Sequence, residues 1–512
     1  MKRILLAGLL LTALSTQAQE TQLLSREFWK TKPELSTVKA ELSKGFDFKT
    51  VHGAADPIFL AIAGDAPVAT IKYLIDQPGV DLKHPTVEGR SYLHIAANKS
   101  NAEITDYLIT KGSDMNMFDA HDHTALTFAA YQGSLTIPVT EVFMKHGVDI
   151  KQKFTNKGGA NLILLEVGFD KDLSLTNYLV SKGVSLNATD DAGNTAFDDA
   201  AQMGNVGIMK ALREKGVKSS GSALMVASQG TYRTANKIEV YKYLVDELKM
   251  DPLVTNKDGQ NVLHNITRKR DQDEIITYFV EKGVDVNKAD KQGNTPFISA
   301  SGTKSLAVVQ LMLPKVKNIN AVNNKGESAL LSAVKSSTAE VVNLLIKNGA
   351  DVKVTDKEGN NLAYYLIDSY RPAGGRGGRF GGAPDPAAVA AAAAQQQRDF
   401  AEKLNALQSK GLNMTAPQKD GNTLYHLAVA KNDLAVVKQL SGLKIDVNAK
   451  NKEGMTALHK AAMTSKDDTI LKYLLTIGAK KDAVTQVDES AYDLAKENEF
   501  LSQKNVSVDF LK

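Results

Sequence analysis

The chain has 512 residues, of which 43% are hydrophobic, and its 62 Lys and Arg residues nearly balance its 58 Asp and Glu residues. A chain so close to neutrality has no long-range field that would attract a nucleic acid or an anionic membrane. No cysteine occurs in it, which excludes disulfides, thiolate zinc sites and lipid anchors on cysteine.

Residues 1–18 have the layout of a secretory signal peptide. Lys2 and Arg3 precede an apolar run from Ile4 to Leu14, and small or polar residues follow it up to Ala18. The run is shorter than the roughly 20 residues that a membrane span needs. We therefore expect cleavage near Ala18 and export to the periplasm or the secreted fraction, with no stable membrane insertion afterwards; a retained anchor is the alternative.

The rest of the chain repeats itself, most often at a spacing of 33 residues. Gly293–Lys325 and Gly326–Glu358 align without a gap. Each copy has a capping Thr or Ser, a short first helix with a small central residue, a second apolar helix, and an extended polar arm that ends before the next glycine. One copy cannot bury its own hydrophobic face, but stacked copies can, so the pattern predicts a one-dimensional solenoid.

The motifs of these copies resemble the ankyrin repeat, whose signature includes T-P-L-H-x-A and G-A-D-V-N. Thr456–Ala461 reads TALHKA, Gly283–Asn287 reads GVDVN, and Asp290–Pro296 reads DKQGNTP. The resemblance covers nearly all of the chain that follows the signal segment. It implies an all-α solenoid of about thirteen helix-turn-helix units with β-hairpin-like arms.

The spacing of the copies divides the chain into blocks. Residues 24–53 are expected to form a partial N-terminal capping unit, in which Arg26–Lys49 supplies a second helix and an arm. Residues 54–218 and 219–487 form two blocks of repeats, because the spacing near Ser219 is too short for an arm. The segment 488–512 supplies a C-terminal capping unit.

The second block contains an insert at 371–398. Arg371–Pro386 is too rich in Gly and Pro to pack, which predicts a flexible loop. Ala387–Gln397 is a strong helix former, so the second helix of this copy should begin early and continue as a rod towards Leu404 and Leu407. The RGGRF sequence in the loop resembles RNA-binding tracts, but the absence of a basic field argues against that role.

Two positions of the repeat identify the residues that should hold neighbouring copies together. Ten of thirteen copies have Ala at the centre of the first helix, where a small side chain allows neighbouring helices to approach; the exceptions are Glu166, Ile266 and Leu366. Four copies have His at the fourth place of the T-P-L-H motif, namely His94, His264, His426 and His459. The resemblance implies that these histidines brace the turn by local hydrogen bonds.

Asp119, His121 and His123 form the one candidate metal site. They alternate along an expected arm, where residues two apart share a face and could chelate a divalent ion. No fourth ligand is evident nearby, so a solvated polar arm is the alternative. No nucleophile elbow, phosphate-cradling loop or H-E-x-x-H motif occurs, and we expect no enzymatic activity and no cofactor.

The resemblance implies that the chain binds another protein through the concave side, which the arms and the exposed ends of the first helices form. By position, the candidate partner-binding residues are Tyr131, Arg268, Arg270, Lys291, Gln292, Asn323, Asn324, Lys325, Lys335, Lys357, Lys431 and Met463. The triplet Arg268–Arg270 suits an acidic partner surface or a solvated turn. We expect a monomeric scaffold that stabilises or escorts an envelope enzyme; the alternatives are a secreted effector that acts on host proteins, and a metal or small-ligand receptor.

Overall fold

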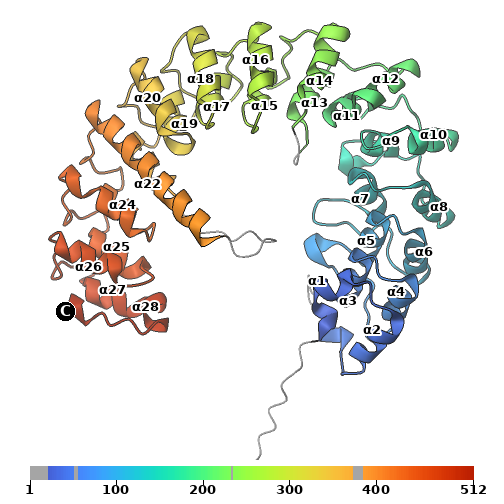
Figure 1. The fold of residues 1–512 in the computed structure, drawn as a ribbon, viewed down its shortest axis with the longest axis horizontal. Coiled ribbons are helices and arrows are strands. Elements are labelled where there is room, and N and C mark those ends of the chain that lie inside the picture. The colour runs from blue at the N-terminus through green and yellow to red at the C-terminus, as the bar shows by residue number, and fades with distance from the viewer. Residues whose placement is uncertain (1–20, 51–55, 232–234, 373–384) are drawn as a thin grey trace, which may run out of the picture. The chain divides into compact units, whose positions relative to one another are not determined.

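The computed structural model describes residues 21–50, 56–231, 235–372 and 385–512, which Figure 1 shows as a succession of short helices. The predicted signal peptide at 1–18 lies outside the described residues. The chain divides into two units, unit 1 (Met1–Val226) and unit 2 (Ala227–Lys512). Within the described residues all regular elements are helical, which confirms the predicted all-α repeat solenoid.

Unit 1 consists of helix pairs, and helices of consecutive pairs pack against each other (Figure 1). The first helices are α1 (Arg26–Lys30), α3 (Pro57–Ala63), α5 (Tyr92–Asn98), α7 (Ala125–Tyr131), α9 (Leu162–Glu166) and α11 (Ala196–Gln202). The second helices are α2 (Leu35–Leu42), α4 (Val68–Ile75), α6 (Ala102–Thr110), α8 (Ile137–Lys145), α10 (Ser174–Ser181) and α12 (Val206–Glu214).

Unit 2 continues the same arrangement after α13 (Ala223–Gln229), the helix in which the two units divide. The first helices are α15 (Val262–Ile266), α17 (Pro296–Ser301), α19 (Ala329–Ser336), α21 (Leu362–Asp368), α23 (Leu424–Val429), α25 (Ala457–Thr464) and α27 (Ala491–Glu497). The second helices are α14 (Ile238–Lys242, continued by a π-helical turn at Tyr243–Glu247), α16 (Asp273–Glu281), α18 (Leu306–Met312), α20 (Ala339–Lys347), α22 (Pro386–Ser409), α24 (Leu434–Gln439), α26 (Thr469–Thr476) and α28 (Glu499–Gln503).

The arms that join successive pairs have very little strand structure. Five of them contain an isolated antiparallel bridge: Phe154 to Ala160, Thr255 to Asn261, Val322 to Ser328, Thr355 to Asn361 and Val484 to Ser490. Short 3-10 turns complete the connections, at Gln22–Leu24, Phe48–Thr50, Val87–Gly89, Thr155–Lys157, Leu313–Lys315, Ser441–Leu443 and Asp509–Leu511.

The centre of each first helix is buried against its neighbours, as the small residues predict. All ten alanines at this position are at most 2% exposed: Ala61, Ala96, Ala129, Ala200, Ala227, Ala300, Ala333, Ala428, Ala461 and Ala495. The larger Glu166, Ile266 and Leu366 are buried there as well, at 2%, 0% and 3% exposure. The copies that lack Ala therefore still bury this position in the core of their own unit.

The histidines of the T-P-L-H position join each repeat to the next one. Nδ1 of His94 accepts a hydrogen bond from the backbone N–H of Ser91 at 3.2 Å, and Nε2 donates to the carbonyl of His123 in the next repeat at 2.9 Å. His264, His426 and His459 repeat both contacts. The predicted bracing role is confirmed, and each histidine also makes a bond between repeats.

The N-terminal unit differs from its prediction in the number of its helices. Arg26–Lys49 is not a second helix with an arm but a pair of helices, α1 and α2, because Lys32 adopts a left-handed φ of 51° and Pro33 cannot continue α1. Trp29 in α1 is 1% exposed, and its indole N–H donates to the carbonyl of Leu23 at 2.7 Å. It packs into the N-terminal end of the stack.

The copy without an arm is held directly to the preceding repeat. Asp198 occupies the histidine position of α11, and its carboxylate accepts from Ser219 Oγ at 2.8 Å and from the backbone N–H of Ser220 at 3.1 Å. Thr195 Oγ1 donates to the carbonyl of Lys218 at 2.8 Å. The predicted block boundary after Lys218 thus lies within unit 1, and the division of the units comes after Val226.

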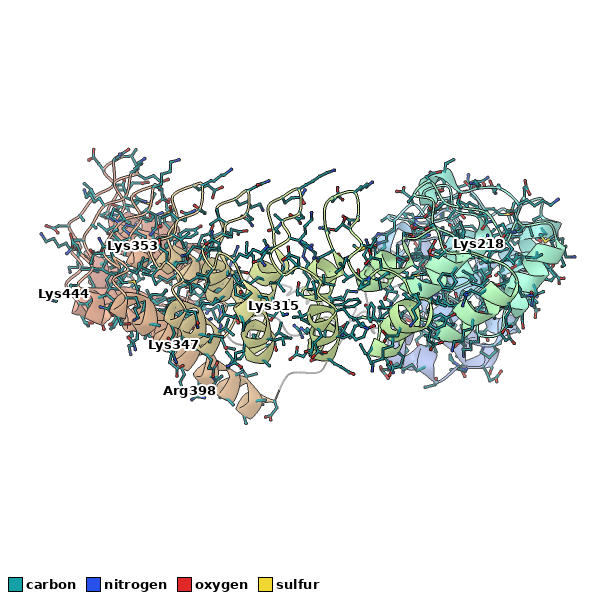
Figure 2. All side chains as sticks on the ribbon, turned by 90° about the horizontal axis from the view of Figure 1, so that it is seen from above. Lys218, Lys315, Lys347, Lys353, Arg398 and Lys444 are labelled. Carbon is teal, nitrogen blue, oxygen red and sulfur yellow. The ribbon has the colours of Figure 1, made fainter. Side chains whose placement is uncertain are left out.

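The insert leads into α22, the 24-residue helix that the Ala-rich stretch predicts. Residues 373–384 of the predicted loop lie outside the described residues. Leu404 and Leu407, towards which the helix was predicted to run, lie within α22 and are buried at 4% and 0% exposure. Arg398 of α22 lies on the side of unit 2 away from the arm residue Lys353 (Figure 2). No described helix, α22 included, is long and apolar enough to cross a membrane.

Candidate protein-binding surface

The arms of unit 2 are tied to one another by their backbones. The N–H of Lys291 donates to the carbonyl of Asp258 at 2.9 Å, that of Asn324 to Gln292 at 2.8 Å, and that of Lys357 to Lys325 at 3.0 Å. Each arm therefore has a fixed position relative to the next one. We call these arms, together with the exposed ends of the first helices, the arm surface.

Glycine makes this close approach of the arms feasible. Gly326 has a φ of 83°, and a Cβ atom on it would lie 3.0 Å from both Asp356 Cα and Lys357 N. A larger residue would therefore be strained by its backbone and would also push the next arm away.

Within an arm, a buried polar side chain fixes the turn. Asp290 Oδ1 accepts from the backbone N–H of Gln292 at 3.0 Å and of Asn294 at 2.8 Å. Burial alone would raise the pKa of Asp290, but the hydrogen bonds from Gln260 and from these two amides hold it below its ordinary value. The carboxylate is therefore charged at neutral pH and its role is structural.

Asn323 is the equivalent residue of the next arm, and the structure places it inside the turn. It is 6% exposed, and its Oδ1 accepts from the backbone N–H groups of Lys325 at 2.9 Å and Glu327 at 3.0 Å. Of the residues predicted for partner binding, Asn323 alone has this bracing position in an arm. The arm residues that are exposed are Lys291, Gln292, Asn324, Lys325 and Lys357.

The predicted residues at the ends of the first helices fall into two groups. Arg268, Arg270, Tyr131 and Met463 are exposed, the last two at 53% and 47%. Lys269, between the two arginines, instead donates to the carbonyl of Gln229, and burial lowers its pKa. Within the triplet, Arg268 and Arg270 therefore have their side chains exposed to solvent.

Lys335 and Lys431 belong to the second group, whose charges have partners within the fold. Lys335 Nζ lies 2.9 Å from Glu327 Oε1 and 5.0 Å from the centre of the Tyr365 ring. Lys431 Nζ donates to the carbonyl of Asp368 at 2.7 Å, and burial lowers its pKa. A partner that bound these lysines would have to compete with those contacts.

The candidate metal residues do not converge on a common point. Both oxygens of Asp119 accept hydrogen bonds: Oδ1 from the N–H groups of His121 and His123, each at 2.9 Å, and Oδ2 from Arg90 Nε at 3.2 Å. His123 is 5% exposed, whereas the His121 side chain is 61% exposed. Among the described residues no group of three or more His, Asp or Glu side chains could hold a metal ion.

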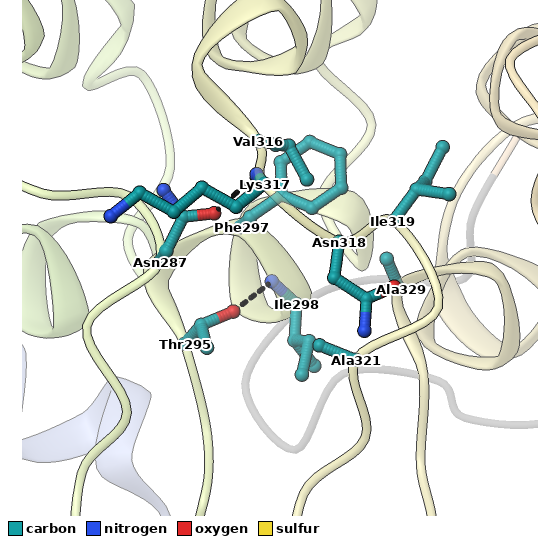
Figure 3. Close-up of a pocket in the computed structure, with 10 residues that line it drawn as sticks. All are labelled: Asn287, Thr295, Phe297, Ile298, Val316, Lys317, Asn318, Ile319, Ala321 and Ala329. Atoms are coloured by element: carbon teal, nitrogen blue, oxygen red, sulfur yellow. Dashed lines mark hydrogen bonds between the residues drawn. The ribbon is translucent and has the colours of Figure 1, made fainter.

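A small cavity of about 160 Å³ lies beside α17 (Figure 3). Its lining includes Phe297, Ile298, Val316 and Ile319. Here the 3-10 turn Leu313–Lys315 replaces the glycine turn that follows most second helices, and the apolar residues that follow are only half-buried. Pockets for small molecules usually measure about 300–1,000 Å³, so this space reflects imperfect packing rather than a receptor site.

Sequence reasoning missed two apolar residues at one repeat position, the exposed Phe169 and the half-buried Met203. They follow α9 and α11 at the place where Tyr131 ends α7, within one residue of the same repeat position. Phe169 is 37% exposed and Met203 is half-buried. The signal was available, since the repeat spacing applied to Tyr131 leads to both residues.

Comparison with known proteins gives matches along most of the chain. A model for ankyrin repeats in three copies matches residues 55–158, 224–322, 263–356 and 389–485, and a model for ankyrin repeats in many copies matches 166–213. These segments together include well over half of the chain. Both matches are to repeat models; the first covers several of the helix pairs described above, and the second covers α10, α11 and nearly all of α12.

Individual relatives are distant. A protein of Rickettsia felis that is named as an ankyrin repeat protein is 22% identical over 55% of this chain and 78% of its own length. The transient receptor potential cation channel subfamily A member 1 of Homo sapiens is 22% identical over 87% of this chain, but over only 32% of its own length. The ankyrin repeat protein nuc-2 of Neurospora crassa is 22% identical over 50% of this chain and 20% of its own length. With the repeat models matching most of its length, this chain belongs to the ankyrin repeat family.

Proposed function

We propose that this protein is an exported scaffold that binds another protein through the arm surface of unit 2. Ankyrin repeats generally mediate binding to other proteins, and as a class they do so without catalysis. One observation carries the choice of surface: exposed polar side chains at the arm tips stand on backbones that are hydrogen-bonded from arm to arm. Such a surface loses little freedom when it binds, which favours affinity.

The proposal also includes the cellular location of the scaffold and its role there. The signal-like residues 1–18 support export to the periplasm, where the scaffold would stabilise or escort an envelope enzyme. Fractionation of the cells, with N-terminal sequencing of the mature protein, tests the location. A cytoplasmic protein that keeps Lys2 and Arg3 would contradict it.

A pull-down from the periplasm tests the binding surface. We expect the wild-type chain to recover a defined partner, and a variant with Arg268→Ala, Arg270→Ala, Asn324→Ala and Lys325→Ala to recover much less of it. The control carries Lys347→Ala and Lys444→Ala, two exposed lysines outside the arm tips (Figure 2). Equal recovery by the wild type and the arm variant would show that the arm surface is not the binding site.

A further inference from the structure

Most neighbouring arms of unit 2 are joined by the same backbone hydrogen bond, in which an N–H near the tip of one arm donates to a carbonyl of the arm before it. The donors of this bond, at 2.8 to 3.4 Å, are Lys291, Asn324, Lys357, Lys452 and Gln486. The repeat places one more such bond between the N–H of Lys419 and the carbonyl of Glu358. No hydrogen bond of either group is found among the described residues. We call this place in the arm surface the arm break.

A side-chain bond between arms is missing at the same place. Asn323 Nδ2 donates to Asn294 Oδ1 of the arm before it at 2.8 Å. Asn451 Nδ2 makes the same contact with Asn422 Oδ1 at 3.0 Å. Gln418 has this position in its own arm and is 6% exposed, but its Nε2 has no hydrogen-bond partner within the described part of the chain. By its register in the repeat, this buried donor points towards the arm before it.

The glycines of the arms show the interruption as open space. A Cβ atom on Gly326 or on Gly421 would lie 3.0 Å from the backbone of the next arm. A Cβ atom on Gly359, just before the arm break, would meet nothing within 4 Å among the residues that the structure describes. The arms on the two sides of the arm break are therefore farther apart than these other neighbours.

The helices on the two sides of the arm break nevertheless stay in contact. α21 packs against α23, and the hydroxyl of Tyr370, which follows α21, donates to Asp433 Oδ2 at 2.7 Å. The stack is therefore continuous at the level of the helices and is interrupted only at the arms. Glu358 and Lys419 are both exposed, so a partner can reach their backbone groups.

An extended peptide has the groups that the arm break lacks. Its backbone presents N–H and C=O groups side by side along one edge, which is how a strand pairs with the edge of a sheet. A cation would satisfy only the carbonyl of Glu358, and an anion would satisfy only the donors, Lys419 N–H and Gln418 Nε2. A helix has free backbone groups only at its ends. The set of open groups thus favours a strand over a charged side chain or a helix.

We propose that an extended segment of a partner protein binds across the arm break through its backbone. An N–H of the segment donates to the carbonyl of Glu358, and carbonyls of the segment accept from Lys419 N–H and Gln418 Nε2. The inference rests on the proposed function, because the arm break lies in the arm surface of unit 2. It adds the form of the partner, a strand without proline at the paired positions and with little dependence on its side chains.

Two synthetic peptides test this recognition on the purified full chain. The first has about nine residues, with Thr and Val alternating between two terminal Lys residues, and the second has the same sequence with a methyl group on every internal backbone nitrogen. Fluorescence anisotropy should show binding of the first peptide at concentrations up to about 1 mM. The second peptide should bind at least about tenfold more weakly, because it has lost its backbone donors.

Hydrogen exchange and variants locate the binding on the protein. In a chain with isotope-labelled lysine, the Lys419 amide should exchange at least about fivefold more slowly once the first peptide is bound. The Lys452 amide, which already donates to Asp420, should keep its rate. Gln418→Met should weaken binding several-fold without lowering the melting temperature, since the donor that it removes has no partner in the free chain. The matched control is Gln310→Met, at an exposed position of α18, which should bind like the wild type.

Four results would each overturn the proposal. Absence of binding by the first peptide would show that water alone pairs these groups. Equal binding of both peptides would show that the backbone is not recognised. An unchanged exchange rate of Lys419 in the complex, or the same affinity in Gln418→Met and the wild type, would place the peptide elsewhere. The exchange measurement uses the wild-type chain, so it decides the matter if a variant is not folded.

The proposed function can fail separately. Its pull-down changes Arg268, Arg270, Asn324 and Lys325 and recovers a natural partner, whereas the peptide experiment concerns the arm break alone. Peptide binding that depends on Gln418, together with equal recovery in the pull-down, would keep the arm break as a peptide site and reject the pull-down surface. Partner recovery that depends on the arm residues, without peptide binding, would do the reverse.

Discussion

Nε2 of His426 donates a hydrogen bond to the carbonyl oxygen of Met455 at 2.9 Å, which joins one repeat to the next. Nδ1 of the same ring accepts from the backbone N–H of Thr423 at 3.1 Å, so the ring is the neutral form with its proton on Nε2. A second proton, on Nδ1, would point at the backbone N–H of Thr423, and this hydrogen bond would be lost. Burial is the largest influence on this ring and lowers the pKa of His426.

The first prediction is a loss of stability in mild acid. The pKa values of His94, His264 and His459 are lowered by burial as well. The folded chain thus binds fewer protons than the unfolded chain, whose histidines titrate near 6.5, so the stabilisation is complete above that pH and is lost as the pH falls below it. Urea unfolding from pH 7.5 to 5 should show that the contribution of these histidines to the free energy of unfolding decreases as the pH falls.

A pair of variants assigns this effect to the buried rings. His426→Gln should cost about 1 kcal/mol at pH 7.5 and should reduce the slope of the pH dependence. His121→Gln, at a side chain that is 61% exposed, should leave both quantities unchanged. A slope that is the same in both variants and the wild type would show that other groups cause the acid sensitivity.

The second prediction concerns Glu166, a carboxyl that is 2% exposed where most repeats have Ala. Burial raises its pKa well above the ordinary value, and the charge of Asp170 adds to this effect. The folded state therefore holds a proton that the unfolded state gives up, so stability falls as the pH rises above about 4.5 and towards the folded pKa. Glu166→Gln removes this pH dependence, because an amide does not titrate.

Glu166→Gln should exceed the wild type in stability by on the order of 1 kcal/mol at pH 8.5, and by less at pH 5.5. Urea unfolding at the two pH values gives the comparison. Glu214→Gln, an exposed acid of the same unit, should show no such difference. If the difference in stability between Glu166→Gln and the wild type is the same at both pH values, the carboxyl of Glu166 does not change its protonation on folding.

The third prediction concerns the attachment of α22. Asp399 Oδ1 accepts from the backbone N–H of Ala339 at 2.6 Å, and Lys403 lies 2.8 Å from Asp399 Oδ2 while it also donates to the carbonyl of Ser337. The Lys403 side chain is 7% exposed. Lys403→Met should destabilise the chain by about 1–3 kcal/mol, because Asp399 and the Ser337 carbonyl both lose a buried partner.

Hydrogen exchange gives the local measurement for this prediction. Amides at the beginning of α20 should exchange faster in Lys403→Met than in the wild type. Arg398→Ala, an exposed neighbour on the same helix, should change stability by less than about 0.5 kcal/mol. Similar exchange at α20 in all three proteins would mean that the pair does not hold α22 in place.

The fourth prediction separates crowding between arms from backbone strain. Gly326 and Gly349 have φ values of 83° and 92°, but only Gly326 has the next arm close by, since a Cβ atom on Gly349 would meet nothing within 4 Å. Both substitutions by Ala should destabilise the chain by about 1 kcal/mol through strain. Gly326→Ala should cost clearly more in thermal unfolding, and equal costs would contradict a rigid ladder of arms.

The sequence predicts those features that recur in every copy. The repeat spacing identifies the buried alanines, and the T-P-L-H position identifies His94, His264, His426 and His459 as bracing residues. These predictions succeed because the same local geometry recurs, so one well-matched copy explains a weaker one. The early start of α22 was predictable for another reason, namely the intrinsic helix propensity of its alanines.

The features that the sequence does not predict depend on contacts between distant residues or on small local differences. Asp399 meets Ala339 across 60 positions of the chain, a pairing that no repeat register contains. Asn323 is a polar residue at an arm position of the repeat, so the sequence predicts that it is exposed. Its side-chain amide instead points into the turn and stabilises it. Lys335 and Lys431 match exposed positions of the repeat. Their ammonium groups, however, contact neighbouring groups that the repeat pattern does not specify.

Site-specific photo-crosslinking tests the central claim, binding of a partner protein through the arm surface of unit 2, most directly. A photoreactive residue at Gln292 lies at an arm tip, and one at Lys347, the exposed last residue of α20, lies outside the arm tips. In intact cells we predict a discrete crosslinked product from position 292 and none from position 347. The same product from both positions, or from 347 alone, would contradict the proposal that the arms form the binding surface.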